Sequence, residues 1–379
     1  MKIVVAPDSF KGSLSAVQVA DCIEKGIKLA DPQCEVIKIP IADGGEGTVE
    51  ALVNATGGEI IHKKVYGPLM KKIDSYFGVL GDKKTAVIEM AAAAGLRLVE
   101  ENSRNPMNTT TYGVGELIKS VLDLGYKNII IGIGGSSTND GGMGMAQALG
   151  VKFYDKESRL LGNAGRYMGE IATIDTTDID PRIFKTNIIV ACDVKNPLFG
   201  MYGAAYVYGP QKGATPQIVE ILDNGLRNLS NKMKQYLDID ISEIQGSGAA
   251  GGLGGGLIAF CKAQLAPGIE IIMKYCNFEE QVMNADLLIT GEGRTDMQTC
   301  YGKVPVGIAK AAEKYNVPVV CLSGGLGEGY EETYKHGIDF ALSHVRGPMT
   351  LEEAILDTEA MLIERAYGIV RLVKKLITR

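Results

Sequence analysis

The chain has 379 residues and a formal net charge of −6, with 46% hydrophobic and 22% charged side chains. This is an ordinary balance for a globular protein of two or three domains, and the 48 glycines are clustered rather than periodic, which excludes a collagen-like chain. The acidic balance gives no indication of a nucleic-acid surface, although local loops can still bind an anionic substrate.

Cysteine usage and hydropathy indicate a cytoplasmic protein. The seven cysteines are scattered without a C-x-x-C pair, which is typical of reduced core thiols. The apolar run at residues 3–6 is too short for a signal peptide, and no run approaches the length of a membrane span. The three histidines, His62, His336 and His344, lack zinc-ligand spacing, so a zinc site or a catalytic triad is not expected.

The chain begins with alternating strands and helices. Residues 2–6 predict a buried strand, and the apolar spacing of residues 16–30 predicts a helix that Ser13 or Ser15 could cap. A second strand over 35–39 and a second helix over 49–55 follow, each pair joined by a polar loop. This order predicts parallel strands of an α/β sheet.

The rhythm changes between residues 59 and 90, where alternating segments separated by turns predict antiparallel strands. Further strands and helices follow, and regular strand–helix alternation resumes near Asp286. The expected strands are 129–131, 187–191, 286–290, 318–322 and 340–343, and the expected helices are 111–124, 145–149, 216–236, 305–315 and 351–376.

A glycine-rich loop follows the strand at 129–131. Residues 132–144 contain six glycines, three hydroxyl side chains and an Asn-Asp pair before the next helix. A strand that leads through glycines into a helix presents backbone N–H groups to an anion such as a phosphate. The alternative is a turn whose Asn139 or Asp140 caps the helix. A second glycine-rich loop, residues 246–256, precedes a helix that runs to Ala263.

Polar residues recur after strands along the whole chain. Several of these loops combine an acid with a base or an amide, which suits a phosphate-and-metal site at the carboxyl ends of strands. Each residue also has a structural alternative: Asp8, Asp43 and Asp140 as helix caps, Lys11 and Lys212 as solvated charges, and Arg294 as an ion-pair partner of Glu292 or Asp296.

Named nucleotide motifs are poorly represented. A P-loop is absent, and Gly246-x-Gly248-x-x-Gly251 matches G-x-G-x-x-G only after a poor strand. This match leaves open a nucleotide-linked oxidoreductase as an alternative function. A non-enzymatic protein that binds small acids is a second alternative, because two α/β lobes suit that role.

Five ordered motifs resemble the type I glycerate kinases of bacteria. They are Ala6-Pro-Asp-Ser-Phe-Lys-Gly-Ser13, Ala42-Asp-Gly-Gly-Glu-Gly-Thr48, Gly134-Gly-Ser-Ser-Thr-Asn-Asp-Gly-Gly142, Gly209-Pro-Gln-Lys-Gly213 and Thr290-Gly-Glu-Gly-Arg-Thr-Asp296. The resemblance implies Mg²⁺- and ATP-dependent phosphorylation of D-glycerate, with the 2-hydroxyl favoured over the 3-hydroxyl. It also implies a flavodoxin-like α/β domain made from residues 1–62 and 281–379, into which a mixed α/β domain, 63–280, is inserted. The chain departs from the family's pattern at Met297 and at 299–301.

Residue chemistry and motif position together assign expected roles, in a site that we expect in the cleft between the domains. Lys11 and Arg294 would neutralise the glycerate carboxylate or the transferring phosphate, and Asp193 or Asp296 would accept the hydroxyl proton. The nucleotide phosphates would contact Gly134, Gly135, Ser136, Thr138, Asn139, Gly251, Gly252 and Gly254. The remaining expectations are substrate contacts from Asp8, Ser13, Asp43, Glu46 and Lys212, and metal ligation by Asp140 and Glu292. No nucleic-acid or membrane partner is expected, and a homodimer is left open.

Overall fold

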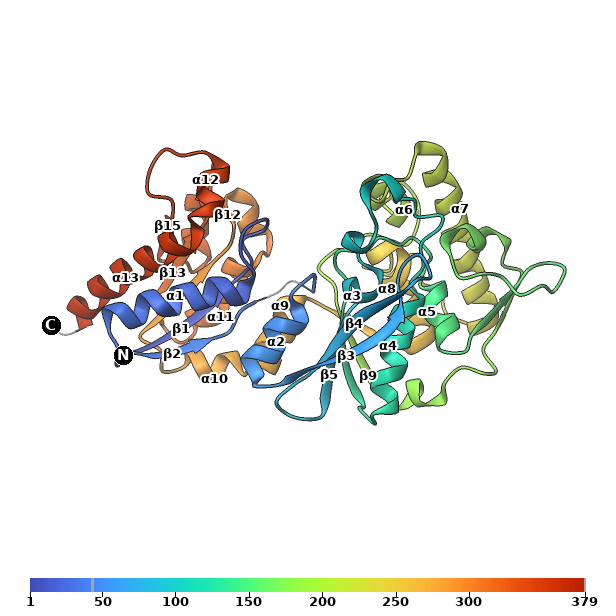
Figure 1. Cartoon of the computed structure of the whole chain (residues 1–379), viewed down its shortest axis with the longest axis horizontal. Coiled ribbons are helices and arrows are strands. Elements are labelled where there is room, and N and C mark those ends of the chain that lie inside the picture. The colour runs from blue at the N-terminus through green and yellow to red at the C-terminus, as the bar shows by residue number, and fades with distance from the viewer. Residues whose placement is uncertain (42–43, 378–379) are drawn as a thin grey trace. The chain divides into compact units, whose positions relative to one another are not determined.

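The computed structural model describes residues 1–41 and 44–377, which form two compact units. Unit 1 comprises Met1–Ala42, Glu50–Gly57 and Ile269–Arg379, and unit 2 comprises Asp43–Val49 and Gly58–Gly268. Both ends of the chain belong to unit 1 (Figure 1). The structure is an α/β fold, as the sequence predicts, with a five-stranded parallel sheet, a six-stranded mixed sheet and two small two-stranded sheets among the described residues.

Unit 1 is built on a five-stranded parallel sheet in the order β2–β1–β11–β13–β15. The strands are β1 (Lys2–Pro7), β2 (Glu35–Lys38), β11 (Leu287–Gly291), β13 (Val319–Ser323) and β15 (Phe340–Ser343). Counted along the chain this is the order 2-1-3-4-5 of flavodoxin-like folds, and the order reverses between β1 and β11. The flavodoxin-like prediction is therefore confirmed for this sheet.

The central strands are apolar on both faces because helices cover both. Ile3 and Val5 pack into a cluster with α1 (Ala16–Ala30) and α13 (Thr358–Ile377), whereas Val4, which is equally buried, points to the opposite face. Figure 1 shows α1 and α13 side by side. Helix α11 (Val304–Glu313) packs against β1, β11 and β13.

The ends of the helices follow local capping chemistry. Of the two serines considered for α1, Ser15 is the cap: its side chain accepts the Gln18 N–H, and the Gln18 side chain accepts the Ser15 N–H in return. The single helix predicted over 351–376 is instead two helices, α12 (Leu351–Leu356) and α13, which are separated at Asp357. Thr350 forms the capping box of α12.

Unit 2 is built on a six-stranded sheet in the order β10–β9–β6–β5–β4–β3. The strands are β3 (Glu59–Tyr66), β4 (Lys72–Val79), β5 (Thr85–Glu89), β6 (Asn128–Gly132), β9 (Asn187–Ala191) and β10 (Gln264–Ala266). β3, β4 and β5 are antiparallel neighbours, as the alternation predicts, and β5, β6, β9 and β10 are parallel. β10 is not among the predicted strands, because Ala266-Pro267-Gly268 has the composition of a turn.

The other elements complete the two units. Unit 2 also contains α3 (Ala91–Ala94), α4 (Tyr112–Asp123), α5 (Met143–Ala148), β7 (Lys152–Tyr154), β8 (Thr173–Asp175), α6 (Ala204–Tyr208), α7 (Pro216–Leu237) and α8 (Leu253–Cys261). Unit 1 also contains α9 (Gly268–Tyr275), α10 (Phe278–Val282), β12 (Arg294–Thr295) and β14 (Gly325–Leu326), and α2 (Thr48–Thr56) contributes its residues from Glu50 onward. Among the described residues, no helix has the length and apolar character needed to cross a bilayer.

Two mid-helix glycines of unit 1 provide a matched test of the packing of α1 on α13. A Cβ at Gly26 would lie 2.4 Å from the Ile363 carbonyl oxygen and 2.7 Å from Ala366 Cβ, whereas a Cβ at Gly368 would meet nothing within 4 Å. We expect Gly26→Ala to lower the free energy of unfolding by about 1–3 kcal/mol through overpacking. Gly368→Ala should raise it by about 0.5–1 kcal/mol through helix propensity. Thermal unfolding followed by circular dichroism measures both, and a stabilised Gly26→Ala variant would contradict the observed helix contact.

Candidate functional site

In unit 2, the loop after β6 is crossed by the backbone of residues 44–45. Gly134 donates its N–H to the Gly44 carbonyl at 2.9 Å. A Cβ at Gly132 would lie 2.6 Å from the Gly44 oxygen, and a Cβ at Gly134 would lie 2.6 Å from Gly45 Cα. These glycines therefore permit one backbone to pass directly over another. The predicted nucleotide contacts of Gly134 and Gly135 stay a prediction.

The two glycine-rich loops pack against each other. Gly251 accepts the Gly141 N–H at 3.0 Å, and a Cβ at Gly251 would lie 2.0 Å from the Thr138 carbonyl oxygen. A Cβ at Gly252 would lie 2.9 Å from Gly141 Cα, which is also too close for a side chain. The second loop is shorter than predicted, because α8 starts at Leu253 and includes Gly254. Much of the glycine content therefore serves loop-to-loop contact.

Lys212 is buried beside these loops. Its ammonium donates to Ser136 Oγ and to the Thr138 carbonyl oxygen, both at 2.6 Å, and its residue is 2% exposed. Burial lowers the pKa of Lys212 to about 7, while the Asp140 carboxylate acts in the opposite direction. Lys212 is therefore not a solvated charge but a buried amine at the end of β6.

Asp140 is held by donors from its own unit. Its Oδ2 accepts the N–H and hydroxyl of Thr111 at 2.7 and 2.8 Å and the Gly144 N–H at 3.3 Å, and its Oδ1 accepts the Gly142 N–H at 3.1 Å. Burial raises its pKa, and these hydrogen bonds act against that rise. Asp140 is not the N-cap of α5, which is Gly142, but its bonds to the Gly142 and Gly144 N–H groups hold the chain at the start of that helix.

Several buried polar atoms of these loops have no hydrogen-bond partner among the described residues. They are Thr138 Oγ1, both amide atoms of Asn139, and Ser247 Oγ. Leaving a buried polar group unsatisfied costs about 1–3 kcal/mol. This polar deficit beside Lys212 is suited to completion by a polar ligand or by water.

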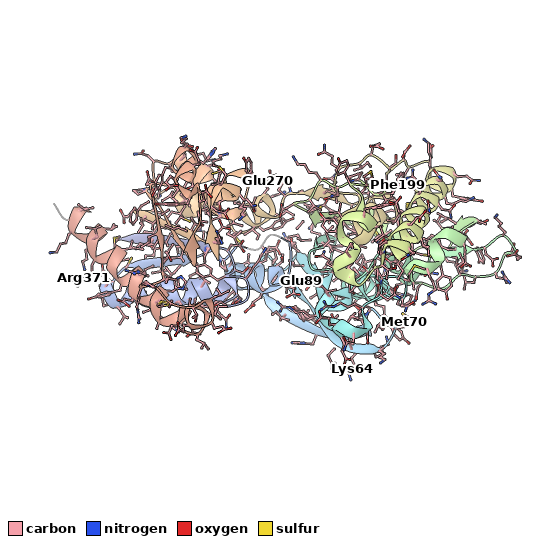
Figure 2. All side chains as sticks on the ribbon, turned by 90° about the horizontal axis from the view of Figure 1, so that it is seen from above. Lys64, Met70, Glu89, Phe199, Glu270 and Arg371 are labelled. Atoms are coloured by element: carbon pink, nitrogen blue, oxygen red, sulfur yellow. The ribbon has the colours of Figure 1, made fainter. Side chains whose placement is uncertain are left out.

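Glu89, labelled in Figure 2, is a buried acid that the sequence reasoning missed. It ends β5 and accepts the Val49 N–H at 2.7 Å, so it holds the loop that carries Glu46. Burial raises the pKa of Glu89, which the N–H groups of Val49 and Gly47 partly offset. Its sequence signal is an acid between Ile88 and Met90 in an otherwise apolar strand. Glu46 itself pairs with Arg97 at 2.8 Å.

Asp193 follows β9 and is exposed. Its Oδ1 accepts the Gly268 N–H at 3.0 Å, which connects the loop after β9 to the chain after β10. Because β5, β6 and β9 are parallel neighbours, their carboxyl ends lie at the same end of the sheet. Glu89 ends β5, and Ser136 and Asp193 come after β6 and β9, so all three belong to that end of the sheet.

In unit 1, the predicted residues gather where the strand order reverses. The Asp8 N–H donates to the Gly291 carbonyl at 2.8 Å, so the loop after β1 begins beside the loop after β11. The Cβ position of Gly293 lies 3.5 Å from the Lys11 backbone nitrogen. Ser13 instead donates to Thr358 Oγ1 at 3.0 Å, at the start of α13. Its predicted substrate contact stays a prediction.

The loop after β11 contains a buried network of hydroxyls around a carboxylate. Glu292 Oε1 accepts from Thr299 Oγ1 at 2.6 Å and from Thr295 Oγ1 at 3.3 Å, and Oε2 lies 3.4 Å from Lys303 Nζ. Thr295 Oγ1 is also 2.7 Å from Ser323 Oγ, at the end of β13. One carboxylate oxygen therefore accepts two hydroxyl hydrogen bonds, and the other forms an ion pair with Lys303.

Arg294 and Asp296 flank Thr295. Arg294 Nε lies 3.6 Å from Asp296 Oδ2, so Arg294 pairs with Asp296, one of the two partners considered. Asp296 Oδ1 also accepts the Gln298 N–H at 2.9 Å and begins a capping box with Thr299.

The structure thus distributes the predicted residues between the units. Asp8, Lys11, Ser13, Glu292, Arg294 and Asp296 lie in unit 1, and Glu46, Asp193, Lys212 and the residues of both glycine loops lie in unit 2. Asp43 lies outside the described residues. Within residues 1–41 and 44–377, no three His, Cys, Asp or Glu side chains come together as a metal-binding group. Metal ligation by Asp140 and Glu292 stays a prediction, and their hydrogen bonds weigh against it.

The fold and its loops together define a two-unit α/β protein with charged side chains at the carboxyl ends of its strands. The sequence profile of the glycerate kinase family matches residues 3–374. A glycerate kinase from Halalkalibacterium halodurans is 50% identical over 367 residues, 97% of each chain, and a glycerate 2-kinase from Escherichia coli K12 is 48% identical over 354 residues, 93% of each. A crystal structure from Salmonella typhimurium LT2, provisionally described as glycerate kinase 2, matches with a TM-score of 0.90 and 45% identity over 100% of both chains. The chain belongs to the glycerate kinase family.

Family membership assigns the chain to the kinases, which are transferases, rather than to the oxidoreductases or to non-enzymatic binding proteins. The G-x-G-x-x-G match has a different explanation in the structure, because Gly248 and Gly251 pack against neighbouring backbone. Whether the chain forms a homodimer stays open.

The buried Lys212 has a signature in the pH dependence of stability. A lysine whose folded-state pKa is about 7 binds fewer protons in the folded than in the unfolded state between pH 7 and its ordinary value near 10.5, so its contribution to stability rises with pH in that window. The slope is at most about 1.4 kcal/mol per pH unit for one group. We expect Lys212→Met to remove this rise in denaturant unfolding between pH 7 and 9. Identical pH profiles for Lys212→Met and wild type would contradict a depressed pKa.

Proposed function

We propose that this protein transfers the γ-phosphoryl group of ATP to the 2-hydroxyl of D-glycerate in a Mg²⁺-dependent reaction. The observation that carries the proposal is the buried Lys212 ammonium beside unsatisfied polar atoms, in a chain of the glycerate kinase family. The Escherichia coli relative named as a glycerate 2-kinase supports the 2-hydroxyl as acceptor.

The unit 2 loops are the proposed site for the nucleotide phosphates. When protonated, Lys212 has three N–H donors and uses two of them on Ser136 and Thr138. The third donor, with the Asn139 amide and the Thr138 hydroxyl, can bind phosphate oxygens in a water-poor environment where such bonds are strong. Exclusion of water there would also suppress hydrolysis of ATP.

The unit 1 loops supply the proposed cations for the small acid. Lys11 and Arg294 follow β1 and β11 at the reversal of strand order, which is the usual ligand position in open α/β sheets. A guanidinium and an ammonium can neutralise the glycerate carboxylate or the charge that develops on the transferred phosphoryl group. Asp193 or Asp296 would accept the proton of the 2-hydroxyl.

Magnesium is proposed to bind mainly through nucleotide phosphate oxygens and water, which is common for this ion. Asp140 does not fit as its principal ligand, since protein groups donate to both of its oxygens, and Glu292 fits poorly, since Thr299 donates to Oε1 and Lys303 forms an ion pair with Oε2. When bound, Mg²⁺ would neutralise phosphate charge. A cytoplasmic location is also proposed, because all seven cysteines are free thiols.

The product distinguishes the two hydroxyls of the acceptor. We expect phosphorus NMR of a reaction with D-glycerate, ATP and Mg²⁺ to show 2-phosphoglycerate and ADP, because the acceptor position follows the relative named for it. Excess EDTA should stop turnover, and added Mg²⁺ should restore it. A 3-phosphoglycerate signal would contradict the proposed regiochemistry, and full activity in EDTA would contradict the metal requirement.

Asp193→Asn and Asp296→Asn test the proposed base. We expect one of them to lower kcat roughly 100-fold or more, because asparagine cannot accept the hydroxyl proton. ADP release in a coupled assay measures the effect. Asp74→Asn is the matched control, since that aspartate is 82% exposed and pairs with Lys64 only at 4.0 Å. Near wild-type kcat in both test variants would rule out both aspartates.

A further inference from the structure

A buried hydroxyl separates two proposed catalytic residues in unit 1. Thr295 is 0% exposed and lies between Arg294 and Asp296 in the chain. Its Oγ1 is 3.3 Å from Glu292 Oε1 and 2.7 Å from Ser323 Oγ. The Thr295 side chain therefore connects the loop after β11 to the end of β13.

The direction of these hydrogen bonds follows from the carboxylate. An ionised carboxylate only accepts, so Thr295 gives its single hydroxyl proton to Glu292. Ser323 must then donate to Thr295 Oγ1, so the Cys321 thiol can act only as a donor here, to Ser323 Oγ at 3.3 Å or to Thr295 Oγ1 at 3.5 Å. We call Ser323, Thr295 and Glu292 the hydroxyl relay. Its bonds all point toward Glu292.

Both ends of the hydroxyl relay are held by further bonds. The Ser323 carbonyl accepts the His344 N–H at 2.9 Å and His344 Nδ1–H at 3.0 Å. At the other end, Thr299 donates to Glu292 Oε1 at 2.6 Å. Backbone bonds run in parallel, from Gly324 N–H to the Glu292 carbonyl at 3.0 Å and from Gly327 N–H to the Thr295 carbonyl at 2.8 Å. Thr295 thus has one defined position.

The fixed position of Thr295 also fixes the positions of Arg294 and Asp296, because all three lie on one extended segment. β12 pairs with β14 as extended backbone, and successive side chains of a strand point to opposite faces. Thr295 points inward, so Arg294 and Asp296 share the other face, where Nε and Oδ2 are 3.6 Å apart. Gly327 lies beneath them, and a Cβ there would be 2.9 Å from Arg294 Nε and from Asp296 Cβ.

We propose that Thr295 is a positioning residue for phosphoryl transfer: through the hydroxyl relay it fixes the extended segment that presents Arg294 and Asp296 to the substrates. The inference rests on the proposed function of those two residues. Because the Thr295 side chain is fully buried, the proposal gives it no contact with substrate. Thr295 therefore affects the rate through the positions of Arg294 and Asp296, since a displacement of a reacting group by about 1 Å can lower the rate up to about 100-fold.

Thr295→Val tests the proposal because it keeps the shape of the side chain and removes the hydroxyl. We expect kcat to fall between about 10-fold and 100-fold, with the KM values for D-glycerate and ATP changed less than about threefold. Thr295→Ser should restore most of kcat, because serine supplies the same donor and acceptor. A purely structural role would predict no selective loss of kcat in protein that is folded at the assay temperature.

Thr333→Val is the matched control. Thr333 is also a 0% exposed threonine of unit 1, and its hydroxyl donates to the Tyr330 carbonyl at 2.6 Å, outside the hydroxyl relay. We expect this variant to lose thermal stability and to keep kcat. An equal loss of kcat in Thr333→Val would overturn the assignment to the hydroxyl relay.

Further variants separate the two levels of inference. Ser323→Ala removes the donor to Thr295 and should lower kcat at least about threefold; it decides the question if Thr295→Val does not fold. Arg294→Ala and Asp296→Asn test the underlying site. If they lose activity while Thr295→Val and Ser323→Ala keep kcat, the positioning role is overturned and the proposed site stands. If all four keep kcat, the roles proposed for Arg294 and Asp296 fail, and the positioning role fails with them.

Discussion

Close approach of backbone to backbone is the constraint on which the strand-end loops of both units depend. In unit 2, residue 44 passes over Gly132, and Gly251 packs on Thr138. In unit 1, a Cβ at Gly291 would lie 1.9 Å from the Leu322 carbonyl oxygen, and one at Gly324 would lie 2.2 Å from the Gly293 oxygen. Any side chain at these positions would separate the loops. Because glycine has no side chain, the backbones of these loops can touch, and the polar side chains that the loops carry come close together as a result.

That closeness explains why so much polarity is buried at these edges. Lys212 loses its hydration and, among the described residues, has Ser136 and Thr138 as its hydrogen-bond acceptors, so burial lowers its pKa. Asp140 is equally buried but accepts hydrogen bonds on both carboxylate oxygens, so it stabilises the loop. The buried Asn139 side chain beside it has no hydrogen-bond partner in the part of the chain that the structure describes. Within one loop, Asp140 thus stabilises the loop structure, whereas the Asn139 side chain can bind a ligand.

Much of the fold could be predicted because its signals are local. Apolar runs and helical spacing identify β1 and α1, and the alternation over 59–90 identifies the antiparallel strands. Elements without a local signal were missed or misjudged: β10 reads as a turn, and the break at Asp357 lies inside a continuous helical pattern. Glycines were recognised as loop formers, but their partners are distant in sequence, so packing of one glycine loop on the other was not foreseen.

The candidate site divides in the same way. The strand-end positions of Asp8, Glu292 and Asp193 follow from the order of elements, which the sequence contains. The burial of a side chain does not follow from the order of elements. Lys212 lies in a polar turn and was considered as a solvated charge, yet it is 2% exposed. Glu89 and the hydroxyl relay are likewise defined by tertiary contacts, as Thr295 meets Ser323 across 28 residues. Residue chemistry indicates what a side chain can do, and the fold decides which neighbours it has.

The pairing of β1 with β11 has a consequence for how the chain folds during synthesis. The Lys2 N–H bonds Asp286 Oδ2 across 284 residues, and β1 obtains its second neighbour only when β11 has emerged. Almost all of unit 2 is a single continuous stretch, Gly58–Gly268, which is complete before then. On the ribosome, unit 2 can therefore form its core before unit 1 does. β1 and α1 remain incompletely packed, and exposed to aggregation, until the last third of the chain has been synthesised.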